Sequence, residues 1–463
     1  MKLCDLSQTR FSQSVKKFAE SMFFPLTVTL VCYISWAFSL VFLGLGVMTA
    51  FFIILMVTQK NSIYSLPIFL LAFYMIPDFK ESYYYTAIYL GLGIMAVIYN
   101  ILVYKTKLKK GDFFYPLLAV FFSALIGGIV YTTMTYGFGE YLKDVAFVLL
   151  LALSFAGGYL FFDNTMSLDN IDYKKYISKI FLCVAILVIA QMVTYYLRVN
   201  NILLAITHKT LFIGWGNTNT VATVLMMTIP FILYLAACYR YGAFFLVFAF
   251  SAYAAIWITQ SRGCIIISTP MLLFYLIYLI IKTKNANRYL IAANAIFCAL
   301  CAAVLIIVFK DEFLELFGKM FLKGFDDSGR FELYDEAWEL FKKHFIFGSG
   351  FFYKTDQINS FMYMFHSTPL QIFANLGVVG IIAFAYFYYY KYKILIKGLP
   401  SAFGMAIMMS IASLELYGLI DVTLVIYYLA ISTLLLLTVA QKNAQMIKIK
   451  NTREENDPNN KNN

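Results

Sequence analysis

The chain has 463 residues, of which 62% are apolar and only 13% are charged. A soluble domain carries about 25% charged residues and roughly half apolar residues, so this chain has too little polar surface to cover itself in water. The composition argues against a soluble enzyme, a disordered chain, a secreted disulfide scaffold and a nucleic-acid-binding domain, and it predicts an integral membrane protein. The net charge of +11 is then read as a topology signal, because membrane proteins concentrate Lys and Arg on one side.

Apolar stretches of membrane-spanning length recur along the chain. A membrane helix needs about 20 consecutive apolar residues. The first stretch, residues 21–59, is uncharged and nearly two spans long, and its Gly44-Leu45-Gly46 segment predicts the turn of a helical hairpin. The later apolar runs are residues 62–76, 83–104, 113–136, 145–162, 177–197, 218–238, 243–259, 264–281, 289–309, 370–390, 399–414 and 417–440. We therefore predict an all-α integral membrane protein with about 12–14 transmembrane helices.

The distribution of Lys and Arg predicts the orientation of these helices. An even number of spans places both termini on one side, and if that side is the cytoplasm then 24 of the 36 Lys and Arg residues fall in cytoplasmic segments. Seven of the others lie in one long loop, residues 310–368. Because cytoplasmic loops are enriched in Lys and Arg, we predict cytoplasmic N- and C-termini and an extracytoplasmic long loop.

The long loop is predicted to contain two helices, and loops of this length are usually functional. Apolar residues at helical spacing predict that residues 311–323 form an amphipathic helix on the bilayer surface, and residues 324–329 predict a turn. A second helix is predicted to begin at Arg330 and to end near Gly348-Ser349-Gly350. Its aromatic residues on one predicted face are Phe331, Tyr334, Trp338 and Phe341. Thr368-Pro369 then restarts a membrane helix, with Thr as the N-cap and Pro at the first helical position.

Two arginines at predicted outer-face positions are candidate ligand-binding residues, since Lys is the usual cation in this chain. The planar guanidinium group binds diphosphates and carboxylates through two parallel hydrogen bonds, which Lys cannot do. Arg262 lies in Ser261-Arg262-Gly263 at the outer end of an apolar helix, where a snorkelling interfacial arginine is the alternative. Arg330 opens the second loop helix, whose N-terminus favours anions, and pairing with a neighbouring acidic residue is the alternative.

The chain has three histidines. His366 directly precedes a predicted membrane helix and could take a proton from a sugar hydroxyl, because histidine titrates near neutrality. The alternative for His366 is a packed interfacial side chain. His344 follows Lys342 and Lys343 and is interpreted as a solvated helix end, whereas His208 could contact a ligand.

Acidic residues and cysteines give no metal signature. The long loop holds ten carboxylates against seven Lys and Arg, so it is not a simple basic funnel. Glu415 and Asp421 are also predicted at the outer face, where they could anchor the arginines or bind acceptor sugars. No acidic cluster has metal-ligand spacing, and nearly all of the seven cysteines lie in apolar runs and look like small core residues. We predict neither a metal nor a cofactor.

Three groups of motifs within about residues 211–390 together resemble a known superfamily. The first is Gly216-Asn217-Thr218-Asn219, opening an apolar helix, and the second is Ser261-Arg262-Gly263. The third runs through the long loop into the next helix as Gly329-Arg330, Trp338, Phe347-Gly348-Ser349-Gly350, His366, Leu370-Gln371 and Gly377-Val378-Val379-Gly380. In this order they resemble the bacterial O-antigen ligases and Wzy-type polysaccharide polymerases.

The resemblance implies a metal-independent glycosyl transfer on the outer face of the bacterial cytoplasmic membrane, in a helical fold of the broad GT-C type. The donor would be a glycan on undecaprenyl diphosphate. Arg262 and Arg330 would hold the diphosphate, and His366 would orient or deprotonate the acceptor hydroxyl. The further substrate-binding candidates are Asn217, Asn219, Gly348, Gly350 and Glu415.

With this resemblance the chain is expected to have four parts. Residues 1–20 would be a cytoplasmic N-terminus and residues 21–210 the N-terminal transmembrane helices. Residues 211–440 would be the ligase- or polymerase-like region, including the extracytoplasmic loop 310–368, and residues 441–463 a disordered cytoplasmic tail. The expected partners are the undecaprenyl-diphosphate-linked oligosaccharide and membrane lipid. A flippase and a chain-length regulator are possible protein partners, and no nucleic acid is expected.

The acceptor stays open at this point. Our first interpretation is a polymerase that joins lipid-linked repeat units into capsule, exopolysaccharide or O-antigen. A ligase that transfers finished glycan to lipid A core or another acceptor would use the same donor. A flippase for the lipid-linked glycan would also have many spans, but transporters typically place polar residues near the membrane midplane and show repeated halves. Here the informative residues gather at one predicted face.

Overall fold

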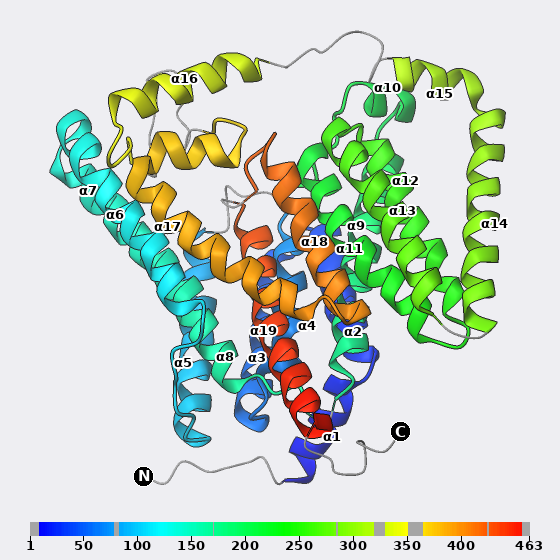
Figure 1. Cartoon of the computed structure of the whole chain (residues 1–463), viewed down its shortest axis with the longest axis horizontal. Coiled ribbons are helices and arrows are strands. Elements are labelled where there is room, and N and C mark those ends of the chain that lie inside the picture. Colours follow the sequence, from blue (N-terminus) through cyan, green and yellow to red (C-terminus); the bar gives the residue numbers. More distant parts are fainter. Residues whose placement is uncertain are drawn as a thin grey trace. The chain divides into compact units, whose positions relative to one another are not determined.

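The computed structural model describes residues 9–77, 83–169, 171–283, 286–318, 329–350, 364–423 and 426–455. Regular structure in these ranges is helical, and the β-type pairing found there is an isolated bridge between Phe212 and Asn217. Figure 1 shows these helices along the chain. Helices satisfy their backbone hydrogen bonds internally, which is what a chain of this hydropathy requires in lipid. The predicted all-α class is confirmed.

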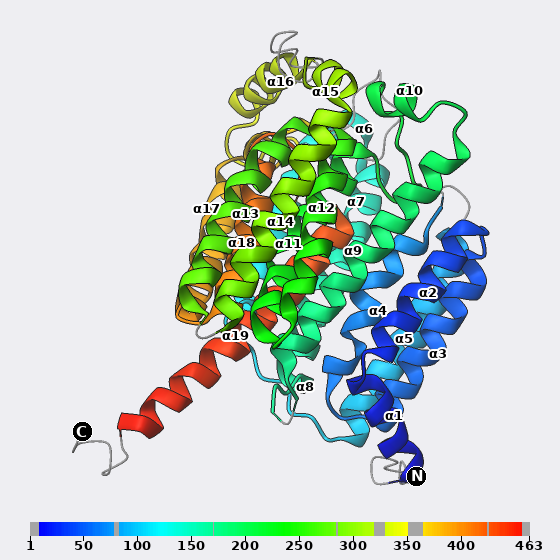
Figure 2. The ribbon, with the colours of Figure 1, turned by 90° about the vertical axis from the view of Figure 1, so that its right-hand side faces the viewer.

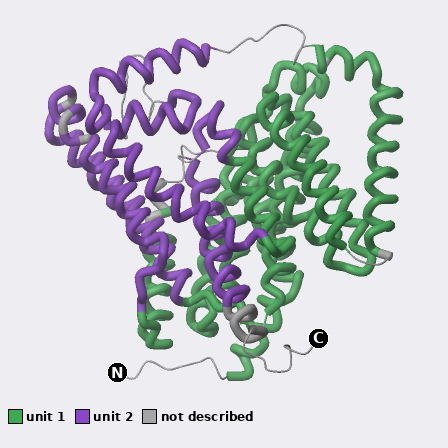
Figure 3. Tube along the Cα trace, viewed as in Figure 1, with its two compact units in different colours: residues 1–107, 165–324, 400–414 green, residues 108–164, 325–399, 415–463 purple. Residues whose placement is uncertain are grey.

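The chain folds into two compact units, each assembled from segments far apart in the sequence (Figure 3). Unit 1 contains residues 1–107, 165–324 and 400–414. Unit 2 contains residues 108–164, 325–399 and 415–463. The division assigns Arg262 to unit 1 and both Arg330 and His366 to unit 2.

Unit 1 is built around α11 (Thr218–Cys238), which packs against α9 (Tyr173–Arg198), α12 (Phe245–Thr259) and α13 (Arg262–Lys282). The apolar window of α11 is 89% buried, more than in any of the other candidate spans. The rings of Phe181 and Phe231 stack at 4.2 Å between α9 and α11. The other helices of unit 1 are α1 (Arg10–Glu20), α2 (Phe23–Ala37), α3 (Val41–Thr58), η1 (Ser62–Ser65), α4 (Leu66–Leu71), η2 (Ala72–Met75), α5 (Tyr83–Val103), α10 (Ile202–Thr207), η4 (Gly242–Phe244), α14 (Ala286–Val308), α15 (Lys310–Phe317) and the first part of α18 (Ala402–Gly418).

The first apolar stretch forms a hairpin whose turn differs from the predicted one. The chain turns at residues 38–40, between α2 and α3, where Ser39 adopts a φ of 57°. Gly44 lies inside α3, and a Cβ on it would come within 2.3 Å of the Ser35 hydroxyl oxygen. The glycine therefore allows close packing of α2 and α3, which lie side by side in Figure 2, and it does not form the turn.

Unit 2 is organised around α17 (Thr368–Gly398), which packs against α6 (Phe114–Tyr136), α16 (Arg330–Lys343) and α19 (Tyr427–Glu455). Helix α17 is kinked at Gly377, whose φ of 60° and ψ of −157° are not helical. Helix α6 also packs against α7 (Phe138–Ala152), which continues through the π-helical turn η3 (Leu153–Gly157) into α8 (Gly158–Thr165).

Fewer helices qualify as membrane spans than the 12–14 predicted. In the described ranges nine helices are long and apolar enough to cross a membrane, or ten if α1 and α2, bent by 74°, form one span. Three shorter apolar helices are Ser62–Met75, Ile88–Val103 and Ala402–Gly418. Apolar composition identified these segments correctly, but short helices and breaks divide several of the predicted runs.

Two details near the C-terminal end also differ from the sequence predictions. Lys391 directly follows the predicted apolar run 370–390 and was counted among the cytoplasmic Lys and Arg residues, but it lies inside α17 with a side chain that is 0% exposed. The tail was predicted to be disordered after Gln441, whereas α19 continues to Glu455. That prediction is wrong for residues 441–455, and residues 456–463 lie outside the described part of the chain.

Candidate functional site

Five side chains of unit 2 form a connected group, which we call the loop cluster. Its members are Arg330, Tyr334, His366, Tyr417 and Asp421. His366 Nδ1 lies 3.2 Å from Asp421 Oδ1, and the Tyr417 hydroxyl donates to Asp421 Oδ2 at 3.1 Å. Arg330 Nη1 donates to the Ile420 carbonyl at 2.8 Å. The structure thus brings together His366 and Arg330, two of the three residues predicted to carry the chemistry.

The backbone around His366 holds its ring beside Asp421. His366 has a φ of 49°, a left-handed conformation that non-glycine residues rarely adopt, and its carbonyl accepts a hydrogen bond from the Tyr334 hydroxyl at 3.2 Å. Two residues later, the Thr368 hydroxyl donates to the Asp421 carbonyl at 3.3 Å and accepts from the Thr423 amide at 3.2 Å. These bonds tie the start of α17 to the chain that follows α18.

Asp421 is held as a carboxylate. Burial by itself would raise the pKa of Asp421, but hydrogen bonds from His366 and the Val422 amide, together with electrostatic attraction to His366 and Arg330, hold this pKa below its ordinary value. The Asp421 side chain is 15% exposed, whereas that of His366 is 40% exposed. The imidazole therefore has a largely buried anion on its Nδ1 side and is itself partly exposed.

Helix α16 begins at Arg330 as predicted, after Gly329 in a left-handed conformation with a φ of 75°. Its buried residues Ala337 and Leu340 pack with Phe365 and Ala374, next to the partly buried Leu333 and Leu370. This contact fixes α16 on the first turns of α17. Because Arg330 starts the helix, the same packing sets the position of its guanidinium group.

The buried face of α16 includes only part of the predicted aromatic face. Phe331 is 63% exposed and Trp338 is 45% exposed, whereas Phe341 is buried. Aromatic spacing alone could not distinguish the packed stripe from its neighbour, because both recur with the helical period. The predicted amphipathic helix at residues 311–323 is described up to residue 318 and forms α15 there. The predicted turn lies outside the described residues except for Gly329.

The glycine motif of the long loop packs against the kink of α17. Gly348 has a φ of 72°, and a Cβ on it would lie 2.2 Å from the Asn375 carbonyl carbon. The amide of Gly350 donates to the Asn375 carbonyl at 2.9 Å, and the fully buried Ser349 donates from its amide to the Ala374 carbonyl at 2.9 Å. Gly348 and Gly350 were predicted to bind substrate; the structure shows them in a tight backbone junction that joins the loop to α17.

The candidate residues of unit 1 lie at two helix starts. Asn217 is the N-cap of α11, and its Oδ1 accepts from the Thr220 amide at 3.1 Å and from the Thr220 hydroxyl at 2.8 Å. Asn219 lies in the first turn of this helix, as the sequence predicted. Arg262 is the first residue of α13, directly after Gln260 in a left-handed conformation and Ser261. Arg262 therefore stands at a helix N-terminus, where backbone amides favour anions.

Glu415 forms an ion pair with Lys391 of α17, so its predicted role in sugar binding competes with a structural one. His344 was interpreted as a solvated helix end, but its Nε2 is buried without a hydrogen-bond partner in the described structure, and its ring contacts Tyr131 at 4.9 Å. Burial, with a smaller effect of Lys343, lowers the pKa of His344. His208 is exposed at the end of α10.

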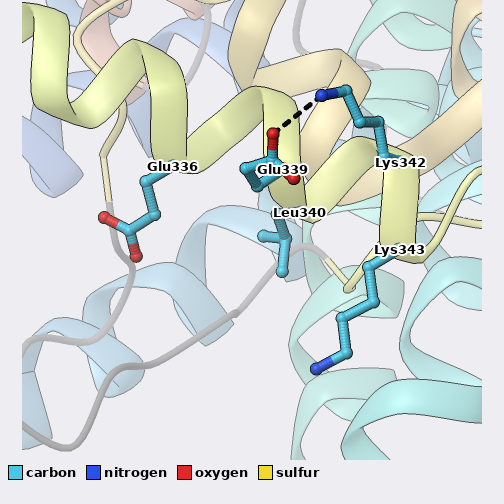
Figure 4. A pocket seen from close by; sticks show the side chains of 5 residues that line it. All are labelled: Glu336, Glu339, Leu340, Lys342 and Lys343. Carbon is cyan, nitrogen blue, oxygen red and sulfur yellow. Dashed lines mark hydrogen bonds and ion pairs between the residues drawn. The ribbon is translucent and has the colours of Figure 1, made fainter.

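A surface depression follows α16 (Figure 4) and is lined by Glu336, Glu339, Leu340, Lys342 and Lys343. Lys342 and Glu339 form an ion pair at 2.7 Å in it. The lining residues come from one helix and include no member of the loop cluster. In the described ranges, no three His, Cys, Asp or Glu side chains gather in a way that could hold a metal ion.

Sequence reasoning placed Asp421 at the outer face but did not identify it as the partner of His366. The two residues are 55 positions apart, with α17 and α18 between them, so no local spacing predicts their contact. Tyr417 and the Ile420 carbonyl were missed for the same reason. The available signal was weak: Asp421 is the one carboxylate inside the predicted apolar run 417–440, where a charged residue usually has a partner.

The fold and the loop cluster describe a helical membrane protein with a histidine–carboxylate pair and an arginine at one site. Residues 244–385 match the model of the family described as O-antigen ligase. The matched segment runs from the start of α12 into α17 and contains Arg262, Arg330 and His366. The resemblance seen in the motifs is confirmed for this region, and the match suggests a glycosyl-transferring membrane enzyme of the ligase or polymerase type. No curated protein and no solved structure matches the chain.

Proposed function

We propose that the protein is a polysaccharide polymerase that joins undecaprenyl-diphosphate-linked repeat units on the outer face of the cytoplasmic membrane. The observation that carries the proposal is the loop cluster: a half-exposed histidine backed by a buried carboxylate, with an arginine from a helix N-terminus beside them. The family match over residues 244–385 supports glycan transfer as the reaction class.

In the proposed reaction His366 acts as the general base. With its Nδ1 hydrogen donated to Asp421, its Nε2 accepts the proton of the acceptor sugar hydroxyl. The hydroxyl oxygen forms a bond to the anomeric carbon of the donor, and the bond from this carbon to the diphosphate oxygen breaks. Undecaprenyl diphosphate leaves with the electron pair. The Asp421 carboxylate stabilises the imidazolium that results, as a buried carboxylate does beside a catalytic histidine.

The arginines are assigned to the diphosphate. Negative charge grows on the leaving group in the transition state, and preorganised guanidinium groups stabilise it. Arg330 is fixed by the Ile420 carbonyl through Nη1, which orients the guanidinium plane. Arg262 stands at the N-terminus of α13, a second place where an anion is favoured.

Transfer by the purified protein from a lipid-linked donor tests these roles. Arg330→Lys, Arg262→Lys and His366→Ala are each expected to lower the rate about 100-fold or more, since a point charge does not replace the planar fork. Arg240→Lys, at an exposed arginine outside the proposed site, serves as the matched control. Wild-type rates in Arg330→Lys and His366→Ala would refute glycosyl transfer at the loop cluster.

A ligase that moves finished glycan to lipid A core or another acceptor is the second candidate, favoured by the description of the matched family as O-antigen ligase. Deletion of the protein followed by glycan profiling separates the two. A single repeat unit on the normal acceptor indicates a lost polymerase, whereas long chains retained on the lipid carrier indicate a lost ligase. Loss of a flippase would instead leave lipid-linked units on the cytoplasmic side.

A further inference from the structure

An ion pair lies inside unit 2 that the proposed reaction does not use. Lys391, on α17, pairs with Glu415, near the end of α18. The Lys391 side chain is 0% exposed, and Glu415 is 19% exposed. The Lys391 Nζ also lies 3.9 Å from the ring centroid of Tyr388, one turn earlier on α17. Ionisable residues buried in apolar helices are rare and usually functional.

The position of Glu415 connects this pair to the loop cluster. Tyr417 follows two residues later, and its carbonyl accepts the amides of Ile420 and Asp421, each at 3.0 Å. The Tyr417 hydroxyl also donates to the Asp421 carboxylate. The residues directly after α18 therefore carry the carbonyl that holds Arg330 and the carboxylate that holds His366, and they are hydrogen-bonded to the last turn of this helix.

The end of α18 also approaches the start of α17 closely. A Cβ on Gly418 would lie 2.9 Å from the Thr423 hydroxyl oxygen and 3.6 Å from the Thr368 Cβ. Helix α17 thus contacts this turn in two ways: through Lys391 far along its length and through Thr368 at its start. Two contacts at separate points define the position of the turn along and around α17.

We propose that the Lys391–Glu415 ion pair is a positioning element that fixes the last turn of α18 against α17 and so holds the Ile420 carbonyl and the Asp421 carboxylate in place for Arg330 and His366. Neither residue of the pair touches substrate. A buried charge whose partner is removed is strongly unfavourable, so the pair admits one arrangement of the two helices where apolar side chains would admit several. The inference rests on the proposed function of the loop cluster.

A disulfide reporter tests the positioning directly. The distance of 3.6 Å between a Cβ at Gly418 and the Thr368 Cβ falls in the range that disulfides require, about 3.5–4.5 Å. In the full-length protein carrying Gly418→Cys and Thr368→Cys, we expect rapid disulfide formation. Adding Lys391→Met should slow it severalfold. Lys393→Met is the matched control, because Lys393 is an exposed lysine on the same helix, and it should leave the rate unchanged.

The second measurement is transfer by protein with native residues at positions 368 and 418. Lys391→Met should lower kcat about tenfold or more while leaving KM for the donor unchanged, because misplaced groups act on the chemical step. Glu415→Gln, which keeps the side-chain shape, should do the same and carries the test if Lys391→Met does not accumulate. In the double variant the loss should not exceed that of either single variant.

Unchanged disulfide formation or unchanged kcat in Lys391→Met and Glu415→Gln would overturn the inference, as would additive losses in the double variant. The disulfide reporter needs no glycan transfer, so it remains informative if the proposed function fails. That failure would show separately, as wild-type transfer in Arg330→Lys and His366→Ala.

Discussion

Replacing Asp421 by Asn tests whether the carboxylate acts on His366 through its charge. The amide has nearly the same shape, and its oxygen can still accept the Val422 amide, which donates to Asp421 Oδ1 at 2.8 Å. The substitution removes the negative charge that stabilises a protonated His366. It also introduces amide hydrogens that face either the histidine or Tyr417.

The structure sets the size of the expected effect. A hydrogen bond to a charged group contributes about 1.5–3 kcal/mol, which corresponds to a rate loss of about 10- to 150-fold. Because 40% of the His366 side chain is exposed, solvent screens part of the interaction, and we expect a loss toward the lower end of this range.

The assay is the initial rate of glycan transfer by purified protein with saturating lipid-linked donor. Asp335→Asn, an exposed carboxylate on α16, is the matched control and should retain the wild-type rate. A rate for Asp421→Asn within about twofold of wild type would show that the His366–Asp421 contact has no part in the reaction.

Three further predictions concern the acid stability, packing and accessibility of unit 2. Since the folded-state pKa of Asp421 is lowered, its stabilising contribution is complete above the ordinary carboxyl pKa and is lost as pH falls through the lowered value. The difference in thermal stability between wild type and Asp421→Asn should therefore stay constant down to about pH 4 and shrink below it. A difference that vanishes near neutral pH would contradict this expectation. Gly348→Ala should lower the unfolding temperature in detergent far more than Gly329→Ala. Both glycines have a positive φ, but only at Gly348 would a Cβ lie within 4 Å of other backbone atoms, and this overlap should cost about 1–3 kcal/mol of additional folding stability. Equal losses in the two variants would refute the tight junction. A cysteine at Glu339, whose side chain is 71% exposed, should react with an impermeant maleimide, whereas one at the fully buried Ser349 should react only after unfolding; equal labelling rates would refute the burial of the junction.

Composition and helical spacing determined much of the architecture. They predicted an all-helical membrane protein, the helix starts near Thr218, Arg330 and Thr368, and Arg330 and His366 as candidate chemical residues. These features are local: an apolar run, a glycine before a helix or a proline at its first turn acts within a few residues, so it can be recognised without knowledge of the rest of the fold.

The tertiary structure alone decided which distant groups meet. It paired His366 with Asp421, Arg330 with the Ile420 carbonyl and Lys391 with Glu415. These contacts join α16 and α17 to the end of α18 and to the residues directly after it. It also placed Gly348 and Gly350 in a backbone junction with α17, a contact that their glycine spacing does not predict, while their part in substrate binding stays a prediction. Such contacts depend on where whole helices pack, and side-chain periodicity specifies a helix face without specifying what that face will touch.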